Sequence, residues 1–208
     1  MPISLAAGIA AREPGSYGAP SFRVAGDRVV LSGLVSASPK TGLLGTLPAQ
    51  ARPSHSVILS AHAHGDSARL NIDPSGKVSL VGATSKFPGG WVSLSGLSFA
   101  RTAATAVPLA VHIYNYGGAF RGASLHASGG LACLAGLVRS KTKTTWGDVA
   151  TLPSGVRPRG GDVIFEANAH AVGARVTVKA NGKVNVDAKT GPISHNWVSL
   201  DGICFAAQ

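Results

Sequence analysis

The chain has 208 residues and a net charge of +10; 45% of its residues are hydrophobic and only 13% are charged. This composition excludes a disordered chain, and short apolar runs broken by Gly, Pro and Ser argue against a mainly helical one. No run approaches the roughly 20 apolar residues that cross a bilayer, so we expect no membrane insertion, and the basic residues are scattered, which argues against nucleic acid as a partner.

The first half of the chain has the pattern of a small all-β module. The start of the chain, residues 1–11, is mildly apolar, and residues 1–16 are expected to form an N-terminal arm. Strands are expected at 27–35, 56–64, 68–73 and 77–81. Asp73-Pro-Ser-Gly76 has the chemistry of a tight turn, because Pro fixes φ and Gly tolerates a positive φ. With Trp91-Val-Ser-Leu94 as its closing strand, a first β-sandwich module is expected over 17–100.

The second half repeats this organisation after a short connection. Residues 101–112 are expected to form a linker and 113–208 a second β-sandwich module. Its clearest hairpin joins strands at 174–179 and 183–187 through Asn181-Gly182, a pair that strongly favours a two-residue turn. The first of these strands alternates valines with polar residues, as a half-buried strand does.

The two halves are copies of one another. The segment Trp91-Val-Ser-Leu-Ser-Gly-Leu-Ser-Phe-Ala100 recurs as Trp197-Val-Ser-Leu-Asp-Gly-Ile-Cys-Phe-Ala206, at an offset of 106. Shorter matches follow in the same order: Gly76–Val78 with Gly182–Val184, Ala61–His64 with Ala167–His170, Arg52-Pro53 with Arg157-Pro158, Gly33–Val35 with Gly136–Val138, and Tyr17-Gly18 with Tyr116-Gly117. The offset changes only in loop-like segments, where insertions are tolerated, so the pattern indicates a tandem duplication.

Several of these motifs together resemble a phage-type tail-fibre module. They are Gly26-Asp-Arg-Val-Val-Leu-Ser-Gly-Leu-Val35, Thr46-Leu-Pro48, Arg52-Pro53, Gly76-Lys-Val78 and Trp91-Val-Ser-Leu-Ser-Gly-Leu-Ser-Phe99. The resemblance covers roughly 17–100 and 116–206, and the second copy departs from it at 128–136.

The resemblance implies an all-β fold of two tandem antiparallel, jelly-roll-like β-sandwich modules that assemble as a homotrimer. It also implies a non-enzymatic virion structural protein: a short fibre, a spike, or a capsid or tail decoration component. The partners would then be other copies of the chain, other virion proteins and a receptor. The alternative is a secreted or cell-surface carbohydrate-binding, lectin-like protein.

Catalytic motifs are absent from the sequence. It contains no Gly-x-Ser-x-Gly elbow, no His-Glu-x-x-His and no phosphate-binding Gly-x-x-x-x-Gly-Lys-Ser/Thr run. His62 and His64, two residues apart on a strand, could hold a metal together with Asp66. The second copy keeps only His170, with Asn168 in place of His62, so no metal, no cofactor and no enzymatic activity are expected.

Candidate binding residues lie in the second copy. Trp146 has no counterpart in the first copy and follows Lys141 and Lys143 in a loop rich in hydroxyl residues. An exposed flat ring among hydrogen-bond donors suits a sugar, whose apolar face stacks on the ring; Tyr114 and Tyr116 could serve in the same way. The competing interpretation is that the loop packs against the sheet or another subunit.

Two arginines and two cysteines complete the candidate residues. Arg52 and Arg157 follow Leu-Pro in both copies, where they either stabilise a rigid loop or contact another subunit with their planar guanidinium groups. Cys133 and Cys204 lie in apolar runs of the second copy. They are expected as buried thiols, with a single bridge as the alternative.

Overall fold

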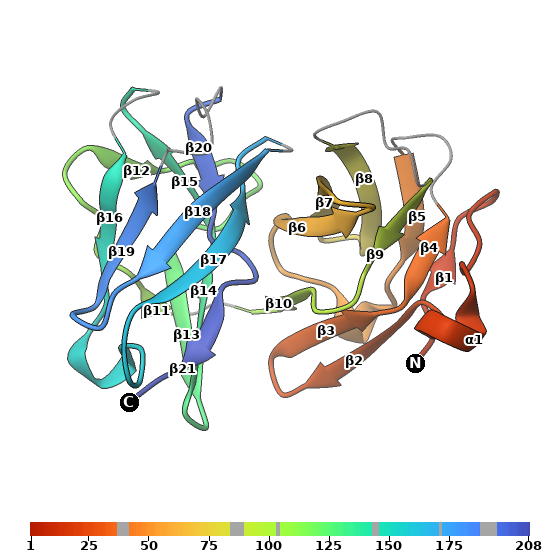
Figure 1. Cartoon of the computed structure of the whole chain (residues 1–208), viewed down its shortest axis with the longest axis horizontal. Helices are drawn as coiled ribbons and strands as arrows, with labels where there is room; N and C mark the ends of the chain where they lie inside the picture. Colours follow the sequence, from red (N-terminus) through yellow and green to blue (C-terminus); the bar gives the residue numbers. More distant parts are fainter. Residues whose placement is uncertain (37–41, 84–89, 103–104, 143–145, 171, 188–194) are drawn as a thin grey trace. The chain divides into compact units, whose positions relative to one another are not determined.

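A computed structural model describes residues 1–36, 42–83, 90–102, 105–142, 146–170, 172–187 and 195–208 (Figure 1). Nearly all of the regular secondary structure in the described chain is β-strand, arranged in antiparallel sheets, which confirms the all-β class. It divides into two compact units, Met1–Thr102 (unit 1) and Ala103–Gln208 (unit 2). Each unit has a hydrophobic core of its own. Among the described residues, no helix has the length and apolar character to span a membrane.

Unit 1 contains one short helix, a single 3-10 turn and ten strands among its described residues. These are β1 (Ser4–Leu5), α1 (Pro14–Tyr17), β2 (Ser21–Ala25), β3 (Arg28–Ser32), β4 (Leu34–Ser36), β5 (Gly42–Thr46), the 3-10 turn (Ala49–Ala51), β6 (Val57–Ala63), β7 (Asp66–Ile72), β8 (Lys77–Ala83), β9 (Trp91–Ser93) and β10 (Ser98–Ala100). The sheets have the orders β1-β5-β8-β7-β6, β10-β3-β2 and β4-β9. In β7, Ala68, Leu70 and Ile72 are buried in the core while their neighbours are partly exposed, the alternation of a strand with one buried face.

Unit 2 is built in the same way. Its strands are β11 (Thr105–Ala106), β12 (Ile113–Asn115), β13 (Ser124–Ser128), β14 (Leu131–Ala135), β15 (Leu137–Ser140), β16 (Gly147–Thr151), β17 (Val163–Asn168), β18 (Gly173–Val178), β19 (Lys183–Asp187), β20 (Trp197–Ser199) and β21 (Cys204–Ala206), with a 3-10 turn at Ser154–Val156. The sheets have the orders β11-β13-β14-β21, β12-β15-β20 and β16-β19-β18-β17.

Equivalent backbone hydrogen bonds recur within each of the two units. The Leu94 amide donates to the Gly33 carbonyl over 2.9 Å, and the equivalent Leu200 amide donates to the Gly136 carbonyl over 2.8 Å. Gly33 has a φ of +99° and divides the strand expected over 27–35 into β3 and β4. The turn of the chain at this point requires a positive φ, and glycine suits it because residues with an L side chain rarely adopt such a φ.

The first residues of each unit are part of its fold. β1 pairs with β5, and Ile3 is buried in the core of unit 1, so the expected N-terminal arm of residues 1–16 lies inside this unit. In unit 2, Val107 is buried in the core, so this part of the expected linker, 101–112, also lies inside a unit. These segments pair over only two residues each, which is too short for a periodic signal in the sequence.

Backbone pairing revises one match between the copies. The Arg12 amide donates to the Leu34 carbonyl, and the Tyr116 amide donates to the Leu137 carbonyl. Leu34 and Leu137 follow the equivalent glycines, so Tyr116 corresponds to Arg12 rather than to Tyr17.

Candidate functional site

The outer face of the β12-β15-β20 sheet carries a pocket. Tyr114 lies opposite Arg139 in the strand register, and Arg139 lies opposite Trp197, so the three side chains are neighbours on one face. Tyr114 and Arg139 line a pocket of about 470 Å³. Trp197 is buried beside them with only 5% of its surface exposed.

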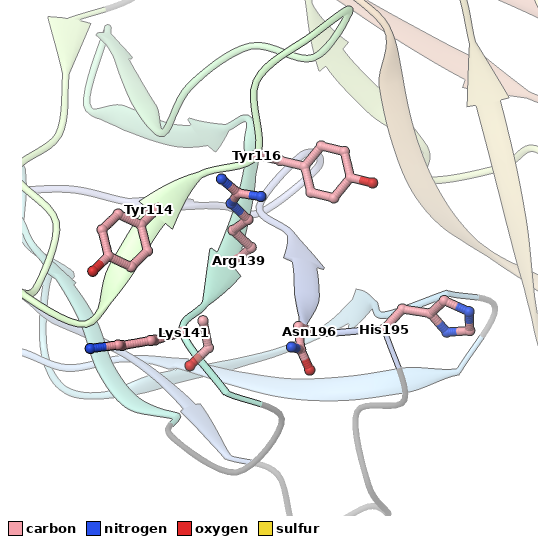
Figure 2. A pocket seen from close by; sticks show the side chains of 7 residues that line it. Tyr114, Tyr116, Arg139, Lys141, His195 and Asn196 are labelled. Carbon is pink, nitrogen blue, oxygen red and sulfur yellow. The ribbon is translucent and has the colours of Figure 1, made fainter.

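The pocket joins two aromatic rings with hydrogen-bonding and cationic groups. Its lining residues are Tyr114, Tyr116, Arg139, Ser140, Lys141, His195 and Asn196 (Figure 2). Tyr114 is 45% exposed and Tyr116 is 42% exposed, so a ligand can reach both rings. The Tyr116 ring meets Phe120 edge-to-face with 5.6 Å between centroids, a contact that holds the ring in place.

The charged residues that line this pocket are all positive. Arg139 and Lys141 are both exposed, and no Asp or Glu belongs to the lining. Within the described part of the chain neither cation has an ion-pair partner, and all nine Asp and Glu residues of the sequence belong to that part. The pocket therefore presents two uncompensated positive charges next to accessible tyrosine rings, an arrangement that attracts an anion.

The structure brings together three of the five predicted binding residues. Tyr114, Tyr116 and Lys141 line the pocket. Trp146 lies elsewhere: its ring is partly buried and packs against the core of unit 2, as the competing interpretation holds. Lys143 lies outside the described residues.

Sequence reasoning missed Arg139, Ser140, His195 and Asn196. Arg139 could have been found from the sequence. It follows an apolar run and lies two residues before Lys141, and side chains two residues apart on a strand point to the same face, so both basic residues are expected on the solvent face. His195 and Asn196 lie directly before the start of β20, and the Ser140 amide donates to the Asn196 carbonyl over 3.0 Å, which brings them to the pocket. Nothing in the local sequence indicates that pairing.

The corresponding strands of unit 1, β4 and β9, border a second pocket, of about 380 Å³. Its lining residues are Arg12, Glu13, Tyr17, Leu34, His62, His64, Trp91 and Ser93. The rings of His62 and His64 both contact Trp91, with centroid distances of 5.9 Å and 5.7 Å. Arg12 pairs with Glu13 over 3.4 Å from Nε to Oε1.

One histidine occupies the same unusual position in both units. His64 begins the two-residue turn between β6 and β7 with a φ of +50°, and the equivalent His170 has a φ of +61°. Each ring meets the tryptophan of its own unit edge-to-face: Trp91 at 5.7 Å for His64, and Trp197 at 5.9 Å for His170.

Among the described residues, His62 and His64 form no cluster with a third metal-binding side chain. His62 accepts a hydrogen bond at Nε2 from the Gly65 amide over 3.3 Å, so this nitrogen serves the turn. Throughout the described ranges, no three His, Cys, Asp or Glu side chains gather at metal-binding distance.

The two predicted interface arginines have contacts inside their units. Arg52 Nε donates to the Leu47 carbonyl over 3.2 Å, and its side chain packs where Gly76 has no Cβ. Arg157 occupies the same position beside Gly182, with Nε 2.8 Å from the point a Cβ would occupy. Each arginine therefore supports a hairpin turn of its own unit, and a subunit contact stays a prediction.

Comparison with known protein families, curated proteins and solved structures found no match for this chain.

Proposed function

We propose that this chain is a non-enzymatic adhesive protein that binds acidic saccharides through the pocket of unit 2, as a receptor-binding component of a virion fibre, spike or decoration. The observation that carries the proposal is the pairing of two uncompensated cations, Arg139 and Lys141, with the accessible rings of Tyr114 and Tyr116.

Each group has a distinct task in this proposal. The planar Arg139 guanidinium suits a bidentate contact with a carboxylate or sulfate, and Lys141 adds a second positive charge. The tyrosine rings offer flat apolar faces to the C–H face of a sugar. Ser140 and Asn196 supply polar groups for its hydroxyls. Aromatic faces combined with a few polar groups that fix the orientation of the ligand are a feature of small-ligand sites.

The virion role rests on the resemblance of the repeated motifs to phage tail-fibre modules. The same resemblance supports jelly-roll-like connectivity and a homotrimer. A trimer would present three copies of each pocket, so weak individual sites would gain avidity on a surface that displays many receptors.

Binding to an array of acidic and neutral glycans tests the saccharide proposal. We expect sialylated, uronate-containing or sulfated glycans to bind, and Arg139→Ala to weaken that binding about ten- to a hundredfold, because it removes a charged hydrogen bond. Arg159→Ala, which removes an exposed arginine outside the pocket, is the matched control. Equal weakening by both variants, or failure to bind any acidic glycan, would contradict the proposal.

The assembly is tested by light scattering on the intact chain. A mass near three times 20.9 kDa is the expected result. A clean monomer that still binds acidic glycans would favour the alternative, a free-standing lectin-like protein. Stronger retention of nucleic acid than of glycans, with a steep loss in salt, would instead indicate a nucleic-acid-binding protein.

A further inference from the structure

The pockets of the two units border the same strand pair of the module, and their described linings share one equivalent position. Arg12 and Tyr116 are equivalent by their backbone hydrogen bonds, and each lines the pocket of its unit. Both pockets also border the strand pair that includes the repeated tryptophan strand, β9 or β20. Each unit therefore has a hollow against this strand pair, and the two hollows are lined largely by non-equivalent residues.

The unit 1 pocket offers a different pair of large aromatic rings to a ligand. Trp91 is partly exposed and lines this pocket, whereas its counterpart Trp197 is buried and lines none of the described pockets. Tyr17, at the end of α1, is 59% exposed and lies on the same pocket. Two flat rings thus border one hollow.

The charge of this pocket is balanced. Its lining contains one arginine and one carboxylate, Arg12 and Glu13, and these two form an ion pair with each other. The Glu13 carboxylate therefore offsets the positive charge of Arg12. The pocket offers guanidinium donors and carboxylate acceptors side by side, which suits neighbouring hydroxyl groups.

The positive φ of His64 is unfavourable for a residue with a side chain, and the contact of its ring with Trp91 helps to explain why histidine is found at this position. The first position of a two-residue turn with positive φ favours Asn, Asp or Gly. Both units have histidine there, with its ring against tryptophan. A strained residue that the surrounding structure maintains is a common feature of functional sites. In unit 1 the turn adds the His64 ring to the wall of the pocket.

We infer that the pocket of unit 1 is a second saccharide site and that it binds uncharged sugars. Trp91 and Tyr17 provide stacking surfaces for the C–H face of a pyranose, and Arg12 and Glu13 meet its hydroxyls. The inference goes beyond the acidic-saccharide site proposed for unit 2, because it rests on different residues and a different ligand class.

The test follows the indole N–H signals of the intact chain by NMR while lactose, maltose, cellobiose or mannobiose is added. We expect at least one of these neutral disaccharides to shift the Trp91 signal, identified by its absence in Trp91→Phe. Tyr17→Ala should weaken that binding at least about threefold, because it removes a stacking ring. Tyr17→Phe, which keeps the ring, should leave it nearly unchanged.

Two controls separate this inference from the proposal for unit 2. The Arg139→Ala/Lys141→Ala double variant should bind neutral sugars as the wild type does, whatever it does to acidic glycans. Tyr17→Ala removes an exposed side chain, so it tests the site even if Trp91→Phe folds poorly. If no neutral disaccharide shifts the Trp91 signal, or if binding survives Tyr17→Ala unchanged, the inference is overturned.

A separate observation concerns the two cysteines. Cys133 on β14 lies directly opposite Cys204 on β21. The flanking backbone bonds run from the Leu134 amide to the Ile203 carbonyl and from the Ala207 amide to the Gly130 carbonyl. Because such bonds alternate along an antiparallel ladder, the cysteines form a non-hydrogen-bonded pair. The Cα atoms of such a pair lie about 4.5 Å apart, within the range of a disulfide.

The register points to Cys133 and Cys204 as a pair that an oxidant can join. Both are thiols in this structure, and Cys204 is partly exposed, which gives a small disulfide access. Oxidised glutathione would accept the two electrons and two protons that the thiols lose, and would leave as two molecules of reduced glutathione. The new bond would tie the last strand, β21, to β14.

Intact mass after incubation of the folded chain with oxidised glutathione tests this pairing. We expect the mass of the chain to fall by that of two hydrogens and both thiols to become unreactive toward a thiol reagent. Cys204→Ser should abolish this fall in mass. Stable addition of glutathione to either cysteine, or unchanged thiols, would overturn the assignment.

Discussion

Gly136 lies where two backbone segments of unit 2 approach each other. It has a φ of +109°, and a Cβ at this position would lie 2.3 Å from the Gly122 carbonyl oxygen. Gly33 has the same surroundings in unit 1, with the Ala19 backbone 2.7 Å from the Cβ position. The glycine at this point of each unit thus satisfies both the turn of the chain and the close contact.

Gly136→Ala should lower the free energy of unfolding of unit 2 by at least about 2 kcal/mol, because rigid backbone on the other side of the contact must move. Gly129→Ala is the matched control: its φ is +58°, but no atom lies within 4 Å of the Cβ position, so only the φ cost of about 1 kcal/mol applies. Urea unfolding of the two variants measures the difference. Equal losses would show that the close contact relaxes freely.

Single residues show where sequence reasoning succeeds and where it fails. Tyr114, on β12, and Tyr116, just after it, were predicted together and both line the pocket, while their role in binding stays a prediction. The place of Trp146 was not predictable, because its loop is locally polar while the core that takes up its ring comes from distant strands. Exposure of a loop aromatic depends on those long-range contacts.

At the scale of the strand pair, β16 and β19 are joined by a polar cluster. The Asp148 carboxylate lies 2.6 Å from Lys183 Nζ and accepts a hydrogen bond from Asn185 Nδ2 over 2.9 Å. The hydrogen bond from Lys183, followed by that from Asn185 and the charge of Lys179, lowers the pKa of Asp148 from 3.8 to about 2.

This lowered pKa makes unit 2 sensitive to acid. The ionised carboxylate stabilises the folded state above pH 3.8, and that contribution is lost as the pH falls from 3.8 to about 2. Lys183→Ala should raise the pKa of Asp148 toward 3.8, measured from its carboxyl resonance in an NMR titration. The melting temperature should fall as the pH is lowered from 3.8 to about 2, and Asp148→Asn should remove the part of this fall that comes from Asp148. An unchanged Asp148 titration in Lys183→Ala would contradict the assigned cause.

Among the elements, hairpins were the most predictable. The turns at Asp73–Gly76 and Ala180–Gly182 lie where their Pro, Asn and Gly residues indicate, because turn chemistry is local. The two-residue strands β1 and β11 gave no such signal, since their identity depends on a partner far along the chain. The repeat was visible in the sequence, but the equivalence of Arg12 with Tyr116 required the hydrogen-bond pattern.

For the whole molecule, the boundaries of the units have a direct experimental consequence. Residues 1–102 expressed alone should unfold in one cooperative thermal transition, because the core and strand pairs of unit 1 lie within this range. Residues 17–102 should not, because β1 leaves the edge of β5 and Ile3 leaves the core. Circular dichroism melts of the two fragments check this. Identical melts would restore residues 1–16 as a dispensable arm.

Both ends of each unit are paired within that unit. The first strands, β1 and β11, and the last, β10 and β21, all find their partners inside their own copy. A unit of this kind can be joined end to end with another without any strand exchanging its neighbour. Duplication of the gene segment can therefore lengthen the chain by one complete unit at a time. Each new copy is then free to change its surface independently, and the two described pockets already have different linings.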